Sequence, residues 1–127
     1  MIEKKIDYHD TDAIGIVHHG AYINFLEVSR TDFFNSKGIP VKNMHERGCY
    51  FVIKKININY KNPSFYGDVV ICEIEVDKVT DAQIFLKQRI LQKQNNNTLL
   101  DAEVVLVLLN EYLKPIVLPN QIKLSLC

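Results

Sequence analysis

One segment with the spacing of a helix, followed by a long stretch with the spacing of strands, is the feature that most constrains this fold. From His19 to about Lys37, apolar or small side chains recur every three or four residues, as on one face of a helix. That face holds Tyr22, Phe25, Leu26, Ser29 and Phe33. The polar residues Asn24, Glu27, Arg30 and Asp32 lie mostly off it. Glu27 and Arg30 are predicted to pair on the helix surface. Gly38 and Pro40 predict the end of the helix. We therefore predict one long helix of about five turns and, from the rest of the chain, one large sheet.

Several segments have strand character. Residues 2 to 9 form the first, and alternation of apolar with polar side chains marks residues 56 to 60 and 72 to 77. Adjacent Lys54 and Lys55 break the alternation just upstream, which is typical of a β-bulge.

The last two strands are predicted to pair as an antiparallel hairpin. Ile84 to Leu91 and Leu99 to Leu109 flank three consecutive asparagines, Asn95 to Asn97, which suit a tight turn. The second of these strands is apolar on both faces in its second half. We therefore expect it to be central, with the helix on one face and a further cover, such as a partner subunit, on the other. The tail contains Pro115 and Pro119 and is predicted to be a loop with one last helical turn.

Length and charge narrow the functional classes. At 127 residues, the chain (1-127) is predicted to form a single domain. Fifteen basic residues balance fifteen acidic ones without a basic cluster, which argues against nucleic acid as a partner. The N-terminus lacks the apolar core of a signal peptide, and no apolar run is long enough to span a bilayer. The spacing of Cys49, Cys72 and Cys127 is typical neither of a metal site nor of a disulfide framework. We therefore expect a cytoplasmic protein.

The chemistry is concentrated in residues 8 to 22, which contain two carboxylates, three histidines and two glycines. A carboxylate such as Asp12, paired with the unpaired backbone N–H groups of a helix start, would place a base or nucleophile beside an oxyanion site. Gly15 is predicted to supply the turn of the loop. The backbone N–H groups of His19 and Gly20 are the best oxyanion candidates, because they lie in the first turn and Gly20 permits close approach. This is the apparatus of acyl transfer.

Each of these residues also has a purely structural explanation. Asp10 or Asp12 can cap a helix or an Asx turn. His19 can orient water or the substrate carbonyl, or be an ordinary hydrogen-bonded group. His9 and His18 are predicted to be bystanders. Adjacent histidines diverge, so no metal is predicted in this segment.

A longer string of residues resembles a known family. Tyr8, Asp10-Thr11-Asp12-Ala13, Gly15, Val17, His19 and Tyr22, followed by Phe25, Glu27, Arg30 and Thr31, resemble the 4-hydroxybenzoyl-CoA thioesterase family of hotdog-fold enzymes, most closely its Tol-Pal-associated YbgC branch. The similarity continues through Tyr60, Asp68, Gln88-Arg89-Ile90, Ala102-Glu103, Lys114-Pro115 and Leu118-Pro119 and so covers nearly the whole chain. The resemblance implies an α+β hotdog fold, in which an antiparallel sheet of about five strands wraps one long central helix.

The resemblance also implies an acyl-CoA thioesterase. In that family the second aspartate of the Asp-x-Asp pair is the catalytic carboxylate, here Asp12, and Tyr8 and His19 fall on active-site positions. Asp12 is then either the nucleophile or the general base that activates water. No added cofactor is needed, because the pantetheine arm brings the thiol. Family members are dimers or dimers of dimers with sites built across the subunit interface. We therefore expect a homodimer or homotetramer, and an association with a Tol-Pal or lipid-synthesis complex.

Two other functions stay open. A hotdog hydratase or dehydratase acting on acyl thioesters needs a histidine and a carboxylate around the acyl β-carbon, and the Asp-Thr-Asp-Ala loop argues against it. A non-catalytic module would bind acyl thioesters unchanged. The expectation that the sequence favours is hydrolysis of an acyl-CoA to the carboxylic acid and CoA, with Asp12, His19 and Tyr8 as catalytic residues.

Overall fold

The computed structural model describes residues 2 to 126. Its elements are β1 (Ile2–Lys5), the 3₁₀ helix η1 (Tyr8–Asp10), α1 (His19–Ser36), α2 (Val41–Glu46), β2 (Tyr50–Tyr60), β3 (Val69–Val79), β4 (Gln83–Gln92), β5 (Thr98–Leu109), β6 (Pro115–Ile116) and α3 (Asn120–Leu126). All strand pairs are antiparallel, the strand order is β1-β3-β4-β5-β2, and the short β6 pairs with β5. The predicted α+β class and the hairpin of β4 and β5 are confirmed.

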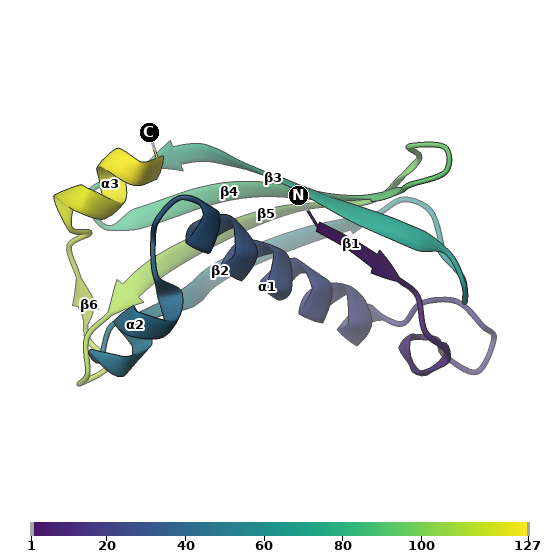
Figure 1. Ribbon diagram of the computed structural model, residues 1–127, viewed down its shortest axis with the longest axis horizontal. Helices are drawn as coiled ribbons and strands as arrows, with labels where there is room; N and C mark the ends of the chain where they lie inside the picture. Colours follow the sequence, from purple (N-terminus) through teal and green to yellow (C-terminus); the bar gives the residue numbers. More distant parts are fainter. Residues whose placement is uncertain (1, 127) are drawn as a thin grey trace.

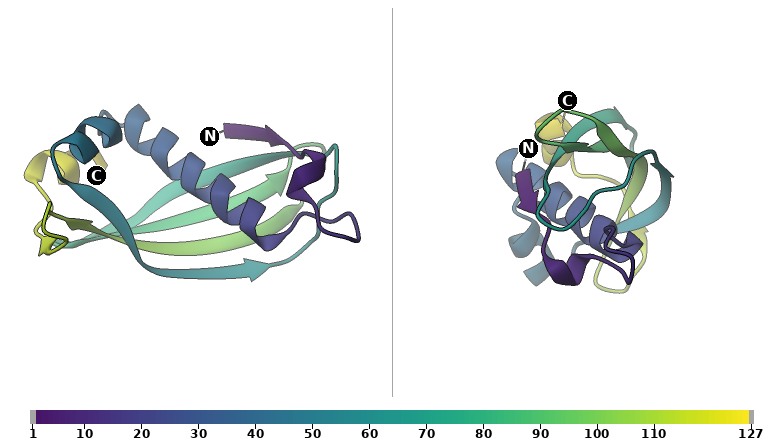
Figure 2. Two further views of the ribbon diagram at one scale, coloured as in Figure 1. Left: turned by 90° about the horizontal axis from the view of Figure 1, so that it is seen from below. Right: turned by 90° about the vertical axis from the view of Figure 1, so that its right-hand side faces the viewer.

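The sheet curls around α1, which crosses its inner face (Figure 1). Seen from the end of the molecule, the strands bend around the helix (Figure 2). The helix begins at the end where η1 and the following loop lie, whereas α2, α3 and β6 lie at the opposite end. This is the wrapped helix of the hotdog fold that the resemblance predicts.

Helix α1 has the predicted start and end. It ends in a Schellman motif, in which the N–H of Gly38 donates to the Asn35 carbonyl and the N–H of Ile39 donates to the Phe34 carbonyl. Gly38 has a φ of +77°, which glycine adopts without strain. The side chains of Phe34 and Ile39, whose backbones form the second of these hydrogen bonds, are both buried.

The core lies between α1 and the sheet and consists of two apolar clusters. One surrounds the first half of α1 and includes Phe25, Leu26 and Leu100. The other surrounds its second half and includes Phe34 and Leu106. Strand β5 lies between β4 and β2 and buries alternate side chains against the helix, which confirms the predicted central position. Its opposite face is half buried, through Val105, Val107 and Leu109.

A polar pair is buried in the sheet–helix interface. Arg30 is 6% exposed and Gln88 is 2% exposed, and the Arg30 guanidinium donates to Gln88 Oε1 over 2.9 Å. Gln88 in turn donates to the Leu26 carbonyl over 3.0 Å. The prediction of a surface pair between Glu27 and Arg30 is therefore wrong. Helical spacing places Arg30 next to Ser29 on the inner side, and Gln88 supplies the acceptor that makes its burial tolerable.

Strand β1 is shorter than predicted. It ends at Lys5 rather than near residue 9, because the chain then turns into η1. The Asp10 carboxylate accepts a hydrogen bond of 2.9 Å from the Asp7 N–H and closes this turn. A local bond between a side chain and the backbone thus competes with strand pairing.

Two irregular features of the sheet agree with the sequence. The register between β2 and β5 shifts between Ile53 and Lys55, which confirms the predicted bulge. The hairpin turn between β4 and β5 places Asn96 at a φ of +59°, a conformation that asparagine tolerates better than most residues. The tail forms two turns of helix in α3, rather than the single turn predicted.

Cys49 and Cys72 are free thiols, and Cys127 lies outside the described residues. Within residues 2 to 126, the helices lack the combination of length and apolar character that a bilayer crossing requires.

Candidate active site

The loop between η1 and α1 is a small hairpin of its own. Thr11 and Val17 form an isolated antiparallel bridge, and the Asp12 N–H donates to the Ile16 carbonyl over 2.8 Å. Gly15 has a φ of +84° at the tip, so it supplies the turn as predicted. The loop is therefore ordered by its own backbone bonds.

Ser64 attaches this loop to the rest of the site. Its carbonyl accepts from the Val17 N–H over 2.9 Å, and its hydroxyl forms a hydrogen bond of 2.6 Å with the Tyr22 hydroxyl. Ser64 is fully buried and Tyr22 is 6% exposed. One residue thus joins the loop to the first turn of α1.

His18, not an aspartate, caps α1. Its Nδ1 accepts a hydrogen bond of 3.1 Å from the Ala21 N–H, so His18 has a structural role, and its predicted absence from the chemistry stays a prediction. A Cβ on Gly20 would lie 3.3 Å from the His18 ring, so the close approach that Gly20 permits is that of the cap. The N–H groups of His19 and Gly20 have no acceptor among residues 2 to 126. Both are therefore free to bind an oxyanion.

A pocket of about 410 Å³ opens beside this helix start. It is lined by Ile16, Val17, His19, Tyr22, Tyr60, Lys61, Asn62 and Pro63. Nδ1 of His19 is hydrogen-bonded to the Tyr60 hydroxyl, and the ring of Tyr60 lies 5.9 Å from that of Tyr22. The pocket therefore has an aromatic wall and includes His19, the first residue of α1.

Both tyrosines of this wall keep their protons at neutral pH. Burial raises the pKa of Tyr22 above its ordinary value and outweighs the opposing effect of the Ser64 hydrogen bond. Burial also raises the pKa of Tyr60, with a further contribution from Tyr22. Both hydroxyls are therefore available as donors.

The structure does not place Asp12 at the helix start. Its carboxylate accepts from the Ile14 N–H over 2.9 Å and forms an Asx turn, the structural alternative that the sequence left open. Tyr8 is 79% exposed and packs edge-to-face on Tyr66, with ring centroids 5.9 Å apart. Neither Asp12 nor Tyr8 lines the pocket, whereas His19 does. The catalytic roles of all three residues stay predictions.

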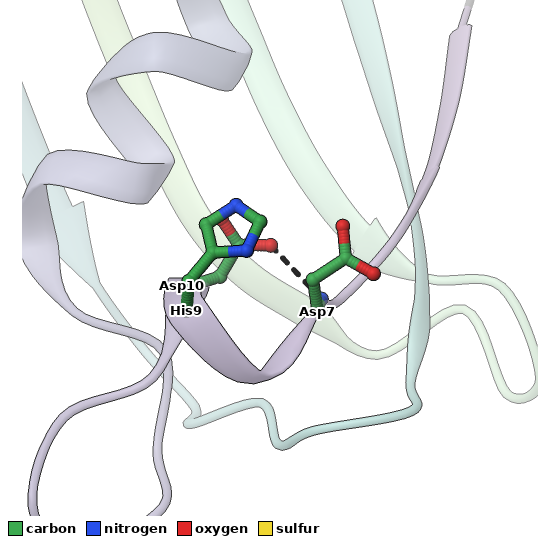
Figure 3. A group of neighbouring side chains, drawn as sticks. All are labelled: Asp7, His9 and Asp10. Atoms are coloured by element: carbon green, nitrogen blue, oxygen red, sulfur yellow. Dashed lines mark hydrogen bonds and ion pairs between the residues drawn. The ribbon is translucent and has the colours of Figure 1, made fainter.

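The nearby acidic cluster is a cap rather than a metal centre. Ligand atoms of Asp7, His9 and Asp10 lie within 4.8 Å of one another. Figure 3 shows the Asp10 carboxylate bonded to the backbone of Asp7. The Lys4 ammonium lies 3.2 Å from the same carboxylate and supplies its counter-charge. A divalent ion would have to displace Lys4, so this donor set does not suit a metal.

We expect the free energy of unfolding of Asp10→Asn to depend less on pH in the acidic range than that of the wild type. Burial alone would raise the pKa of Asp10, but the bonds from the Asp7 N–H and Lys4 lower it overall. A lowered pKa in the folded state stabilises the fold above the unfolded pKa of about 4, and that stabilisation is lost as pH falls through the folded pKa. The variant should unfold about 1 kcal/mol more easily at pH 7. In chemical denaturation, this difference should shrink toward zero in acid. Asp7→Asn, which keeps the backbone donor, should show no such trend.

Comparison with known proteins decides the family. The model of the thioesterase-like superfamily matches residues 6–123. The chain belongs to the thioesterase-like superfamily. The acyl-CoA thioester hydrolase YbgC of Escherichia coli is 30% identical over 120 residues, which is 93% of this chain and 88% of that protein. A protein of Aquifex aeolicus is 34% identical over 80 residues, which is 63% of this chain but only 62% of the relative, less than two thirds of its length.

Solved structures of thioesterases have the same fold as this thioesterase-like chain. The DHNA-CoA thioesterase of Staphylococcus aureus superposes with a TM-score of 0.86 at 26% identity, covering 91% of this chain and 78% of that one. The predicted family resemblance is therefore confirmed.

Tyr60 and Ser64 are two residues of this thioesterase-like site to which the sequence assigned no role. A signal for Tyr60 was present, because alternation along β2 puts it on the same face as Ile56 and Ile58, which pack on the core. Ser64 lies in an irregular segment, and no periodicity marked it.

Proposed function

We propose that the protein hydrolyses acyl-CoA thioesters at the pocket beside the start of α1. Water adds to the acyl carbonyl carbon, the C–S bond breaks, and the products are a carboxylic acid and the free thiol of CoA. The observation that carries this proposal is the pair of free N–H groups, those of His19 and Gly20, at a helix start whose first residue, His19, lines the pocket. The family membership supports the same reaction.

The N–H pair suits the charge that develops in this reaction. Attack on a thioester carbonyl moves negative charge onto its oxygen, and fixed donors at a helix N-terminus stabilise that charge without having to reorganise. The apolar side chains Ile16, Val17 and Pro63 border the same pocket and can accommodate the acyl group. Binding and charge stabilisation are thus adjacent.

In this proposal Asp12 supplies the attack, as nucleophile or as the base that deprotonates water. It lies on the loop that Val17 and Ser64 attach to the pocket, and its side chain is exposed rather than buried in the core. Tyr8 and His19 position the reactants.

We extend the proposal to a homodimer or homotetramer. Strand β2 ends the strand order and pairs only with β5 among the described strands, so its other edge is available to a second copy. The half-buried Val105, Val107 and Leu109 on the outer face of β5 provide further apolar surface.

The free thiols of Cys49 and Cys72 agree with a cytoplasmic location. Association with a Tol-Pal or lipid-synthesis complex stays an expectation from the family resemblance.

The test is release of free CoA from a panel of short-chain, long-chain and aromatic acyl-CoA esters. Liquid chromatography of the products is the suitable readout, because the protein's own thiols would react with a thiol reagent. We expect turnover on at least one class of ester. Binding of the esters without turnover on any of them would instead identify a non-catalytic acyl-thioester-binding module.

A further inference from the structure

We propose that Tyr60 is a positioning residue for His19. Its hydroxyl donates to Nδ1 of His19 and holds the imidazole in the tautomer that carries its proton on Nε2, so that Nε2–H is a hydrogen-bond donor for the substrate carbonyl oxygen. The inference rests on the proposed thioesterase function and assigns a role to a residue outside the predicted catalytic set.

Tyr60 is held from two sides. It is the last residue of β2, where it pairs with Leu100 of β5, and the next residue continues the pairing through a bond of 2.8 Å from the Lys61 N–H to the Leu99 carbonyl. Its ring also packs at 48° against Tyr22, whose hydroxyl is bonded to the fully buried Ser64. The hydroxyl of Tyr60 is therefore presented to His19 by a rigid strand end rather than by a loop.

The direction of this hydrogen bond determines which nitrogen of His19 carries the proton. A neutral ring has one N–H donor and one acceptor nitrogen, and the hydrogen bond at one nitrogen determines the state of the other. The Tyr60 hydroxyl can donate or accept, and Nδ1 of His19 is its one hydrogen-bond partner among residues 2 to 126; we assign the hydroxyl as the donor. Donation to Nδ1 leaves Nε2 protonated, and Nε2 has no protein partner in the same part of the chain.

This donor adds a third hydrogen bond to the oxyanion site. The ring belongs to the same residue whose backbone N–H is free at the helix start, and this residue lines the pocket. A charged neighbour does not replace it, because the Lys61 ammonium at the pocket is bonded to Asp101 over 3.0 Å. A neutral donor positioned by Tyr60 is therefore a side-chain donor that the pocket can offer to the carbonyl oxygen.

The chain contains a natural control for this pair. At the other end of the same strand, Tyr50 packs against His45 with ring centroids 4.6 Å apart, but no hydrogen bond joins them. Tyr50→Phe removes the same hydroxyl from the same strand without touching His19. Tyr60→Phe keeps the ring that packs on Tyr22 and removes only the donor.

The experiment combines nitrogen-15 NMR of the histidine rings with steady-state kinetics. In the wild type we expect the His19 signals of the Nε2–H tautomer. Tyr60→Phe should shift them toward a mixture of tautomers and lower kcat about 10-fold, the effect of one neutral hydrogen bond, with a smaller change in KM. Tyr50→Phe should change neither. In a His19→Gln background, where the side-chain amide has no tautomer, Tyr60→Phe should have no further effect on kcat.

The two readouts separate this inference from the proposed function. If the wild type hydrolyses esters but Tyr60→Phe leaves both the tautomer and kcat unchanged, the inference is wrong and the thioesterase proposal stands. If the His19 signals show Nδ1–H in the wild type, the inference is wrong whatever the kinetics. A protein that hydrolyses no ester contradicts the proposed function, and the NMR result then still reports on the pair.

Discussion

Asp12→Asn is expected to lower kcat for thioester hydrolysis by at least about 100-fold, the typical minimum for loss of a general base, and by more if Asp12 is the nucleophile. The fold should not change. The Asx turn needs only an acceptor for the Ile14 N–H, and the side-chain oxygen of asparagine supplies it as well as a carboxylate does. The measurement is release of CoA from the best ester of the panel, with circular dichroism and thermal unfolding as checks of the fold.

Asp32→Asn is the matched control for this result. Asp32 is an exposed carboxylate of α1 that makes no hydrogen bond or ion pair within the described chain, so its loss should leave kcat unchanged. If Asp12→Asn and Asp32→Asn turn over alike, Asp12 is only the residue that forms the loop turn. A correctly folded Asp12→Asn variant that has lost turnover but still binds the ester would assign the chemistry to the carboxylate.

Gln88→Leu is expected to destabilise the protein by about 3 kcal/mol. Leucine has a similar volume but cannot accept from Arg30, which would then keep its charge in the interface between α1 and the sheet without its hydrogen-bond partner. Burial already lowers the pKa of Arg30 from its usual value, with Glu27 opposing the shift. Arginine nevertheless stays charged at neutral pH. Urea denaturation monitored by circular dichroism would measure the loss.

The double variant Arg30→Met with Gln88→Leu should recover most of that stability, because it removes the buried charge together with its partner. The corresponding double-mutant cycle should therefore show strong coupling. Equal destabilisation by Gln88→Leu in the wild-type and Arg30→Met backgrounds would mean that packing, and not the unpaired charge, explains the effect.

The elements that the sequence predicted well are those whose pattern is local. The period of α1, its end at Gly38, the bulge near Lys54 and the turn at Asn96 each depend on neighbouring residues, and all four were found. Arg30 was misplaced because its acceptor, Gln88, is 58 residues away in the sequence. Helical spacing identifies a face, but not whether a distant strand offers a partner to a charge on that face.

The candidate site was predicted in part for the same reason. The free N–H groups of His19 and Gly20 follow from the position of the helix start, which the sequence predicted at His19. The cap at His18 did not, because a histidine is an uncommon N-cap and Asp12 was the more usual candidate. Tyr60 lies 41 residues from His19. Its hydrogen bond to His19 depends on how β2 crosses the start of α1, which no local pattern encodes.

Ser64 has a mechanical consequence for the site. Its carbonyl bonds the Val17 end of the Asp12 loop, while its hydroxyl bonds the tyrosine that supports Tyr60. The Asp12 loop and the aromatic wall therefore share one anchor, and we expect their motions to be coupled. A substrate that swings the loop would disturb the packing of Tyr22 in the same event. Amide hydrogen exchange at Val17 and the ring signals of Tyr22 should respond together during turnover.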